Sequence, residues 1–151
     1  MPAQKNKIRP MDPFRDMRAL ADLLELAFGE VLDSSGRQMI REARSWASAR
    51  YLYQPLQLLT GSMSPLGPGF VWVKDDKIVG HTTLIRSNRR PGVWQIANVA
   101  VHPQYQRQGI ASELMKHVLE LVRRKDGRLV ALQVRRESAA VGLYDKLGFE
   151  A

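Results

Sequence analysis

The sequence contains no cysteine, so neither a disulfide framework nor a thiolate metal site can form. No apolar run approaches the roughly 18 residues that a membrane-spanning helix needs. The basic residues near the start are not followed by the apolar stretch of a secretion signal. We therefore expect a cytoplasmic protein with no membrane segment and no metal site.

Acidic residues are also few relative to basic ones: 15 against 23, a formal net charge of +8 over 151 residues. The densest basic runs are short and separated in sequence (residues 89–90, 123–125 and 135–136). Scattered charge of this kind is typical of a solvated surface, and a polyanionic cofactor would also favour a basic protein. A nucleic-acid-binding domain has only this charge in its support, so nucleic acid is not an expected partner.

The first half of the chain changes from a helical to a strand period. Apolar spacing predicts a helix over residues 12–28 and a second helix that begins at Ser34 or Ser35 and runs through Trp46. A short strand is expected near Ile8, and residues 60–69 have the composition of a loop. Residues 70–73, 78–85 and 93–101 are rich in β-forming side chains and are separated by turn sequences. They predict an antiparallel three-stranded meander.

The second half returns to helices around one further strand. A helix after Pro103 has an apolar face that includes Ile110 and Leu114, and Asp126 with Gly127 should end it. The continuous apolar run at residues 129–134 predicts a buried strand. A final helix should be capped by Ser138 and end at Gly148. The whole chain, residues 1–151, is thus expected to be a single α/β domain with a mixed sheet flanked by helices.

Residues 99–111 (VAVHPQYQRQGIA) should run from a strand through a turn into a helix. This arrangement places unpaired backbone N–H groups of a new helix at the end of a strand, where they and the helix dipole attract anions. Gly109 and Ala111 would leave the backbone open to a pyrophosphate, and Arg107 could add a charged donor. The alternative is that both small residues only let the helix pack closely on the sheet.

This segment resembles the signature of the Gcn5-related N-acetyltransferase (GNAT) family. That signature is Gln or Arg, two residues, Gly, one residue, then Gly or Ala, after a strand that ends in apolar-Ala-Val-His-Pro. The resemblance implies acetyl-CoA as the cofactor. It also implies that the backbone of Val99, Ala100 and Val101 pairs with the pantetheine arm. The residues that would wrap the pyrophosphate are Gln106, Arg107, Gln108, Gly109, Ile110 and Ala111.

A second segment, residues 143–149 (LYDKLGF), matches the family pattern apolar-Tyr-x-Lys-x-Gly-Phe. The resemblance implies that Tyr144 hydrogen-bonds the coenzyme A sulfur and protonates the departing thiolate. The pKa values of a phenol and a thiol lie within about two units, which makes this transfer reasonable. Taken alone, Tyr144 could also be a core tyrosine. Ser138 stands where the family often has Asn and can still donate one hydrogen bond, while Ala140 should pack against the cofactor arm.

The resemblance implies an N-acetyltransferase in which a primary amine of a small molecule or peptide attacks the thioester directly. Strand N–H groups near Val99 would stabilise the oxyanion. The family often has an acidic residue on this strand, whereas residues 94–98 (WQIAN) contain none. Asn98 is the candidate that orients the amine or a water, as is Gln95, although neither can take a proton. The base is left open between an ordered water chain and four side chains: His81, His102, Glu30 and Asp33.

The sequence ends at Ala151, where this fold normally adds a final strand pair. We expect a piece of a longer protein; the alternative is an edge completed by a homodimer or an additional domain. The acid-free strand also supports a second functional hypothesis, a CoA-binding regulatory or sensor module with weak catalysis. Five aromatic residues could line an acceptor pocket, although core packing is the expected fate of most: Trp46, Tyr51, Tyr53, Trp72 and Trp94.

Overall fold

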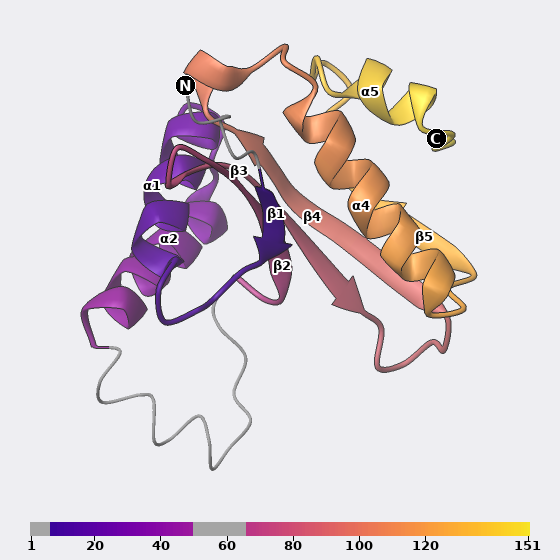
Figure 1. The fold of residues 1–151 in the computed structure, drawn as a ribbon, viewed down its shortest axis with the longest axis horizontal. Helices are drawn as coiled ribbons and strands as arrows, with labels where there is room; N and C mark the ends of the chain where they lie inside the picture. The colour runs from indigo at the N-terminus through magenta and orange to yellow at the C-terminus, as the bar shows by residue number, and fades with distance from the viewer. Residues whose placement is uncertain (1–6, 50–65) are drawn as a thin grey trace.

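The computed structural model describes residues 7–49 and 66–151. Five strands form one sheet in the order β1-β2-β3-β4-β5 (Figure 1). Strands β1 to β4 pair antiparallel with their neighbours, and β5 runs parallel to β4. The predicted meander and mixed sheet are confirmed. The strand bounds are Lys7–Pro10 (β1), Gly69–Lys74 (β2), Lys77–Arg86 (β3), Val93–Val101 (β4) and Leu129–Leu132 (β5).

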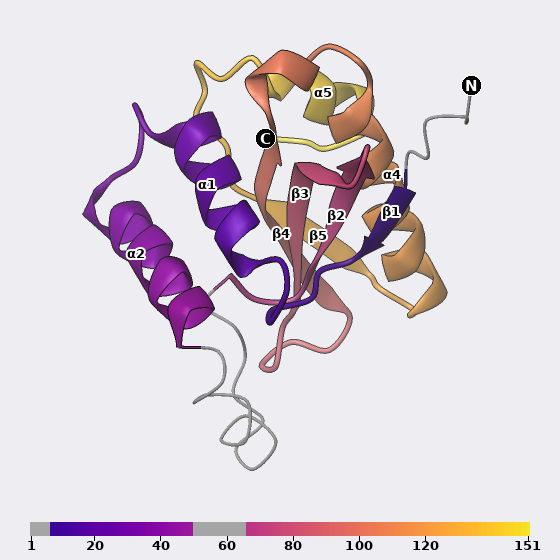
Figure 2. The same ribbon diagram turned by 60° about the vertical axis from the view of Figure 1, so that its left-hand side comes forward.

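Helices cover both faces of this sheet, as Figures 1 and 2 show. Helices α1 (Met17–Phe28) and α2 (Ser34–Ser48) lie on one face, and α4 (Ile110–Arg124) lies on the other, with the short α5 (Val141–Lys146) beside it. Buried side chains from α1 and α2 form one core with the sheet, and side chains from α4 form a second with the opposite face. The predicted α/β fold is therefore confirmed. None of the described helices has the length and apolar composition needed to cross a bilayer.

Helix α1 begins later than predicted, and α2 begins at Ser34 as predicted but has a different capping residue. Helix α1 starts at Met17 because Asp12 forms a separate turn, in which its side chain accepts hydrogen bonds from the backbone N–H of Phe14 at 2.9 Å and of Arg15 at 3.3 Å. Helix α2 is capped by Asp33 and not by either serine that follows it. The Asp33 carboxylate accepts a 2.8 Å hydrogen bond from the N–H of Gly36, three residues ahead, which is the geometry an N-cap requires.

The C-terminal strand was also predicted incorrectly. Strand β5 ends at Leu132, two residues before the end of the apolar run, and Leu129 is 55% exposed. It is an edge strand that pairs only with β4 in the part of the chain described, so one side of it faces solvent. Ser138 does not cap α5, because its hydroxyl accepts from the N–H of Ala140 (3.2 Å) in a turn that precedes the helix. Gly148 follows the helix with φ +86°, as predicted.

The three tryptophans of the described chain belong to the cores. Trp94 is buried among the side chains of the α4 face, while Trp46 and Trp72 are partly buried against the other core clusters. None of them lines the cavities described below. Tyr51, Tyr53 and most of the predicted loop at residues 60–69 lie outside the described residues, although Gly69 itself begins β2.

Candidate active site

Strand β4 carries a bulge in its second half. In the pairing of β3 with β4, His81 faces Ala100 but Thr83 faces Ala97, so that Asn98 and Val99 together oppose the single residue between them. Asn98 has φ +51°, in the left-handed region that Asn tolerates better than most side chains do. A bulge of this kind bends the strand and re-aims the side chains next to it. Nothing in the local sequence pattern indicated it.

Strands β4 and β5 also separate beyond the bulge. Their pairing ends at Ile96 and Leu132, whereas β4 continues to Val101. On that side, the backbone of residues 97–101 has no strand partner among the described residues. The separation exposes backbone donors and acceptors of β4 at the point where the chain turns towards α4.

A cavity of about 450 Å³ lies along this part of β4, between the turn before α4 and helix α5. We refer to it as the donor cavity. It brings together eleven of the residues predicted to bind the cofactor: Val99, Ala100, Val101, Gln106, Arg107, Gly109, Ile110, Ala111, Ser138, Ala140 and Tyr144. Gln108 is the exception, since it does not line the cavity and its side-chain amide lies 3.5 Å from the carbonyl oxygen of Gln104. Sequence reasoning missed Ala27 and Phe28 at the end of α1, which also line the cavity.

The turn before α4 is shaped to receive an anion. Gly109 has φ +81° and precedes the helix, and a Cβ placed on it would meet no atom within 4 Å. The backbone N–H groups of Ile110, Ala111 and Ser112, in the first turn, have no acceptor in the described chain. Open space in front of free N–H donors at the positive end of a helix dipole suits a pyrophosphate. The residues present therefore fit the phosphates of coenzyme A.

A second cavity, of about 330 Å³, lies between β4, β5 and the α1–α2 connection, and we refer to it as the acceptor cavity. It shares Phe28, Val99, Ser138, Ala140 and Tyr144 with the donor cavity, so the two meet at these residues. Among its described lining residues there is no Asp, Glu or His, and the one charged side chain is Arg135. Its other polar members, besides Ser138 and Tyr144, are Asn98 and Gln133.

Tyr144 lies where the two cavities meet. Its side chain is only 8% exposed, and burial raises the pKa of its phenol above the ordinary value of 10.0. Its ring packs edge-on against Phe149 at 6.0 Å between centroids, and its hydroxyl has no hydrogen-bond partner among the described residues. The phenol is thus protonated at neutral pH and free to donate to a ligand atom.

The side chains that the sequence offered as bases lie elsewhere. His81 is fully buried on β3, where burial lowers its pKa to about 4 despite a hydrogen bond to the carbonyl of Phe70. His102 accepts a 3.2 Å hydrogen bond from the N–H of Gln104 in the turn after β4. Glu30 and the helix cap Asp33 line neither the donor cavity nor the acceptor cavity.

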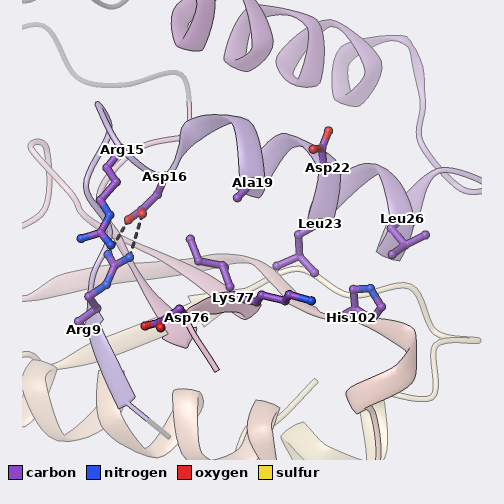
Figure 3. A pocket seen from close by; sticks show the side chains of 11 residues that line it. Arg9, Arg15, Asp16, Ala19, Asp22, Leu23, Leu26, Asp76, Lys77 and His102 are labelled. Carbon is purple, nitrogen blue, oxygen red and sulfur yellow. Dashed lines mark hydrogen bonds and ion pairs between the residues drawn. The ribbon is translucent and has the colours of Figure 1, made fainter. Parts of the chain in front are cut away.

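His102 instead lines a third cavity, of about 440 Å³, between α1 and the start of β3 (Figure 3). At one end of this cavity Arg9 of β1 forms a two-pronged ion pair with Asp16, with nitrogen–oxygen distances of 2.6 and 2.8 Å. Burial alone would raise the pKa of Asp16, but the hydrogen bonds from Arg9 and from the N–H of Asp12 outweigh it and lower that pKa. This pair, which the sequence did not indicate, ties the first strand to the start of α1.

Comparison with known proteins agrees with this geometry. The model of the Acetyltransferase (GNAT) family matches residues 36–149. The chain is 40% identical over 53 residues to the [Ribosomal protein bS18]-alanine N-acetyltransferase of Escherichia coli, a match that covers 34% of this chain and 36% of that protein. It is 33% identical over 75 residues to the N-alpha-acetyltransferase RimI of Mycobacterium tuberculosis, covering 48% of this chain and 46% of that protein. These matches span less than half the length of either relative.

Solved structures extend the likeness to nearly the whole chain. A GNAT family acetyltransferase of Brucella melitensis in complex with acetyl-CoA superposes with a TM-score of 0.66 at 22% identity, covering 98% of this chain and 84% of that one. The ribosomal-protein-S18-alanine N-acetyltransferase of Escherichia coli gives a TM-score of 0.69 at 20% identity, covering 96% and 77%. The fold is shared throughout, and with the family match over residues 36–149 it follows that the chain belongs to the GNAT acetyltransferase family.

Proposed function

We propose that this protein transfers the acetyl group of acetyl-CoA to the α-amino group of a peptide or protein N terminus. The observation that carries the proposal is the junction of the two cavities. The donor cavity holds the turn that fits phosphates, and the acceptor cavity is open to a second substrate. Both reach Tyr144 and the backbone of Val99, so a thioester and an amine entering from the two sides would meet there.

The reaction at this junction is a single acyl transfer. The neutral amine attacks the thioester carbonyl carbon, and the carbon–sulfur bond breaks as the carbon–nitrogen bond is completed. In this proposal the N–H of Val99, which lines both cavities, stabilises the negative charge that develops on the carbonyl oxygen. Tyr144 gives its proton to the leaving sulfur and regains one from solvent, and the proton released by the amine passes to solvent. No cysteine is present to form an acyl-enzyme.

The polar lining of the acceptor cavity selects the kind of amine. Its described members include no carboxylate and no histidine, so nothing among them can deprotonate an ammonium group. In this proposal the amine therefore arrives neutral. An α-amino group has a pKa of about 7.7–8.0 and is roughly one third neutral at pH 7.5, whereas a lysine side chain, with a pKa of about 10.4, is neutral to roughly one part in a thousand.

The names of the relatives support the same conclusion. The Escherichia coli protein is described as acting on an alanine of ribosomal protein bS18, and the Mycobacterium tuberculosis protein as an N-alpha-acetyltransferase. The first description names a residue of a protein as the acceptor, and the second names an α-amino group. Arg135, which is exposed at the cavity, would suit a carbonyl or carboxylate of a peptide acceptor.

Two matched peptides test the proposal. One has a free N terminus and no lysine, and the other has an acetylated N terminus and one lysine. Coenzyme A release and mass spectrometry at pH 7.5 should show acetylation of the first peptide at a rate at least a hundredfold higher. Equal rates on the two peptides would contradict the α-amine assignment. The rate should rise with pH through the pKa of the peptide amine and fall only at a higher pH than an exposed tyrosine would give, because burial raises the pKa of Tyr144.

A second candidate function is a CoA-binding sensor with little turnover, which the base-free acceptor cavity also supports. Both functions predict that acetyl-CoA raises the melting temperature. Only the transferase predicts that Tyr144→Phe slows the chemical step, by about 10²-fold or more, while acetyl-CoA binding is retained. Binding without turnover on an N-terminal peptide library would favour the sensor.

A further inference from the structure

Three polar side chains form a connected group directly behind the acceptor cavity. His81 and Thr83, on β3, are 0% and 1% exposed, and Asn98 on the bulge of β4 lines the cavity itself. The Nε2 atom of His81 lies 3.1 Å from the hydroxyl oxygen of Thr83, and the Nδ2 atom of Asn98 donates to the same oxygen at 3.3 Å. The group therefore runs from the buried interior of the sheet to the acceptor cavity.

The hydrogens available to this group can be counted. The Nδ1 atom of His81 lies 3.1 Å from the carbonyl oxygen of Phe70, which can only accept, so Nδ1 must carry the proton of the neutral ring. Its Nε2 atom is then an acceptor. The hydroxyl of Thr83 has one hydrogen, and two acceptors lie within 3.1 Å of it: the Nε2 atom of His81 and the carbonyl oxygen of Leu66. Whichever of the two it serves, that hydrogen is not available to Asn98.

The count settles the orientation of the Asn98 carboxamide. Thr83 can present only lone pairs to Asn98, so the NH₂ end of the carboxamide must face Thr83 and the Oδ1 atom is the end left unbonded. The left-handed backbone of Asn98, with φ +51°, holds the residue in the bulge at the cavity wall. The buried hydrogen bonds thus fix a carbonyl-type acceptor on the wall of a cavity whose described lining offers no carboxylate.

We propose that the Oδ1 atom of Asn98 accepts a hydrogen bond from the attacking amine, and that Thr83, braced by His81, is a positioning residue that fixes this orientation. The inference rests on the proposed acyl transfer. A hydrogen bond from one N–H of the amine to Oδ1 directs the nitrogen lone pair towards the thioester and stabilises the positive charge that grows on nitrogen. Asn98 does not act as a base: the proton lost by the amine passes to solvent.

Thr82 provides a matched control inside the same strand. It is also fully buried, but it lies between His81 and Thr83 and so points to the opposite face of the sheet. Its hydroxyl has no hydrogen-bond partner among the described residues. Thr82→Val and Thr83→Val make the same chemical change at adjacent buried positions. Only the second removes the hydrogen bond to Asn98, which lines the acceptor cavity.

Steady-state kinetics with acetyl-CoA and an N-terminal peptide test the proposal. Asn98→Gly removes the carboxamide at a backbone conformation that glycine adopts freely, and kcat/KM for the peptide should fall about tenfold, as expected for the loss of one hydrogen bond. Thr83→Val should lower it severalfold, Thr83→Ser should restore it, and Thr82→Val should leave it unchanged. The double variant Thr83→Val/Asn98→Gly should be no worse than Asn98→Gly alone, because the two residues act as one unit. The KM for acetyl-CoA should not move in any variant.

The outcomes that would overturn the inference are distinct from a failure of the acyl transfer itself. If kcat/KM for the peptide in Asn98→Gly stays within twofold of the wild-type value, Asn98 has no role in the reaction. If the losses of the two single variants add in the double variant, Thr83 is not the residue that positions Asn98. The orientation is tested without turnover by side-chain amide exchange in NMR. The Asn98 NH₂ protons should exchange at least tenfold more slowly than those of the exposed Asn88, and Thr83→Val should abolish the difference. Equal exchange rates for the Asn98 and Asn88 side-chain amides in the wild type would overturn the orientation, and this test needs no knowledge of the acceptor substrate.

Discussion

Acidification should destabilise this protein through His81. The ring is fully buried on β3, one nitrogen bonded to the carbonyl of Phe70 and the other to the hydroxyl of Thr83. Burial lowers its pKa from 6.5 to about 4, although the Phe70 carbonyl and the negative charge of Asp16 both act in the opposite direction. The folded state therefore holds His81 neutral in a pH range where the unfolded chain binds a proton.

The sign and size of the effect follow from this difference. Above pH 6.5 the ring is neutral in both states and contributes no pH dependence. As the pH falls from 6.5 towards 4, the unfolded state takes up a proton that the folded state refuses, so stability declines by at most about 1.4 kcal/mol per pH unit. With the pKa at about 4 in the folded protein, the loss between pH 7.5 and pH 4.5 amounts to about 2.5 kcal/mol.

Urea unfolding of the wild type and of His81→Asn over this pH range measures the effect. The asparagine amide can still donate to the Phe70 carbonyl but does not titrate, so subtraction of the two curves removes the contribution of every carboxylate that the two proteins share. The wild type should lose about 2.5 kcal/mol more than the variant between pH 7.5 and pH 4.5. A difference in unfolding free energy that stays constant with pH would refute the assignment of a depressed pKa to this ring.

Three further predictions concern the backbone and the buried ion pair. Gly109→Ala and Gly148→Ala introduce the same strain at a left-handed backbone position, and each should cost about 1 kcal/mol in thermal unfolding. Only Gly109 lies in the donor cavity, so only Gly109→Ala should weaken coenzyme A binding in calorimetry, by tenfold or more. Gly80→Ala would place a Cβ 2.8 Å from Ile110 where α4 packs on the sheet, and should cost about 1–3 kcal/mol in a urea titration. Asp16→Asn leaves Arg9 without its ion partner and should cost about 2–3 kcal/mol; an unchanged unfolding midpoint would show that the pair contributes nothing.

The elements that sequence predicted correctly are those with a local cause. The change of period from helix to strand, the apolar face of α4 and the turn sequences between β2, β3 and β4 each lie within a few neighbouring residues. The turn from residue 99 to residue 111 is equally local, because its small residues and its helix start are contiguous. This is why nearly all the residues predicted to bind the cofactor line one cavity.

The errors arose where the outcome depends on distant partners. The apolar run of β5 reads as buried, but burial depends on whether a strand lies beside it, and β5 is at the edge of the described sheet. Asp33 and Ser34 are both good helix caps, and the choice between them depends on how α1 and α2 pack. The bulge at Asn98 depends on the register of β3 against β4. The Arg9–Asp16 pair joins β1 to the start of α1, and the sequence of neither element predicts a contact with the other.

The acceptor cavity shows the same dependence in its chemistry. Its walls come from the α1–α2 connection, from β4 and from the chain after β5. No single one of these segments could therefore predict that the described lining contains no base. With no base among the described lining residues, the degree of ionisation of the amine itself would decide which acceptor reacts. The difference in neutral fraction between an α-amine and a lysine at pH 7.5 is a few hundredfold, or about 3 kcal/mol. That equals or exceeds what an apolar pocket gains by distinguishing one methylene group. A cavity that omits a proton acceptor can therefore favour N termini over lysines with no specific contact to either, and this preference should diminish steadily as the pH is raised towards 10.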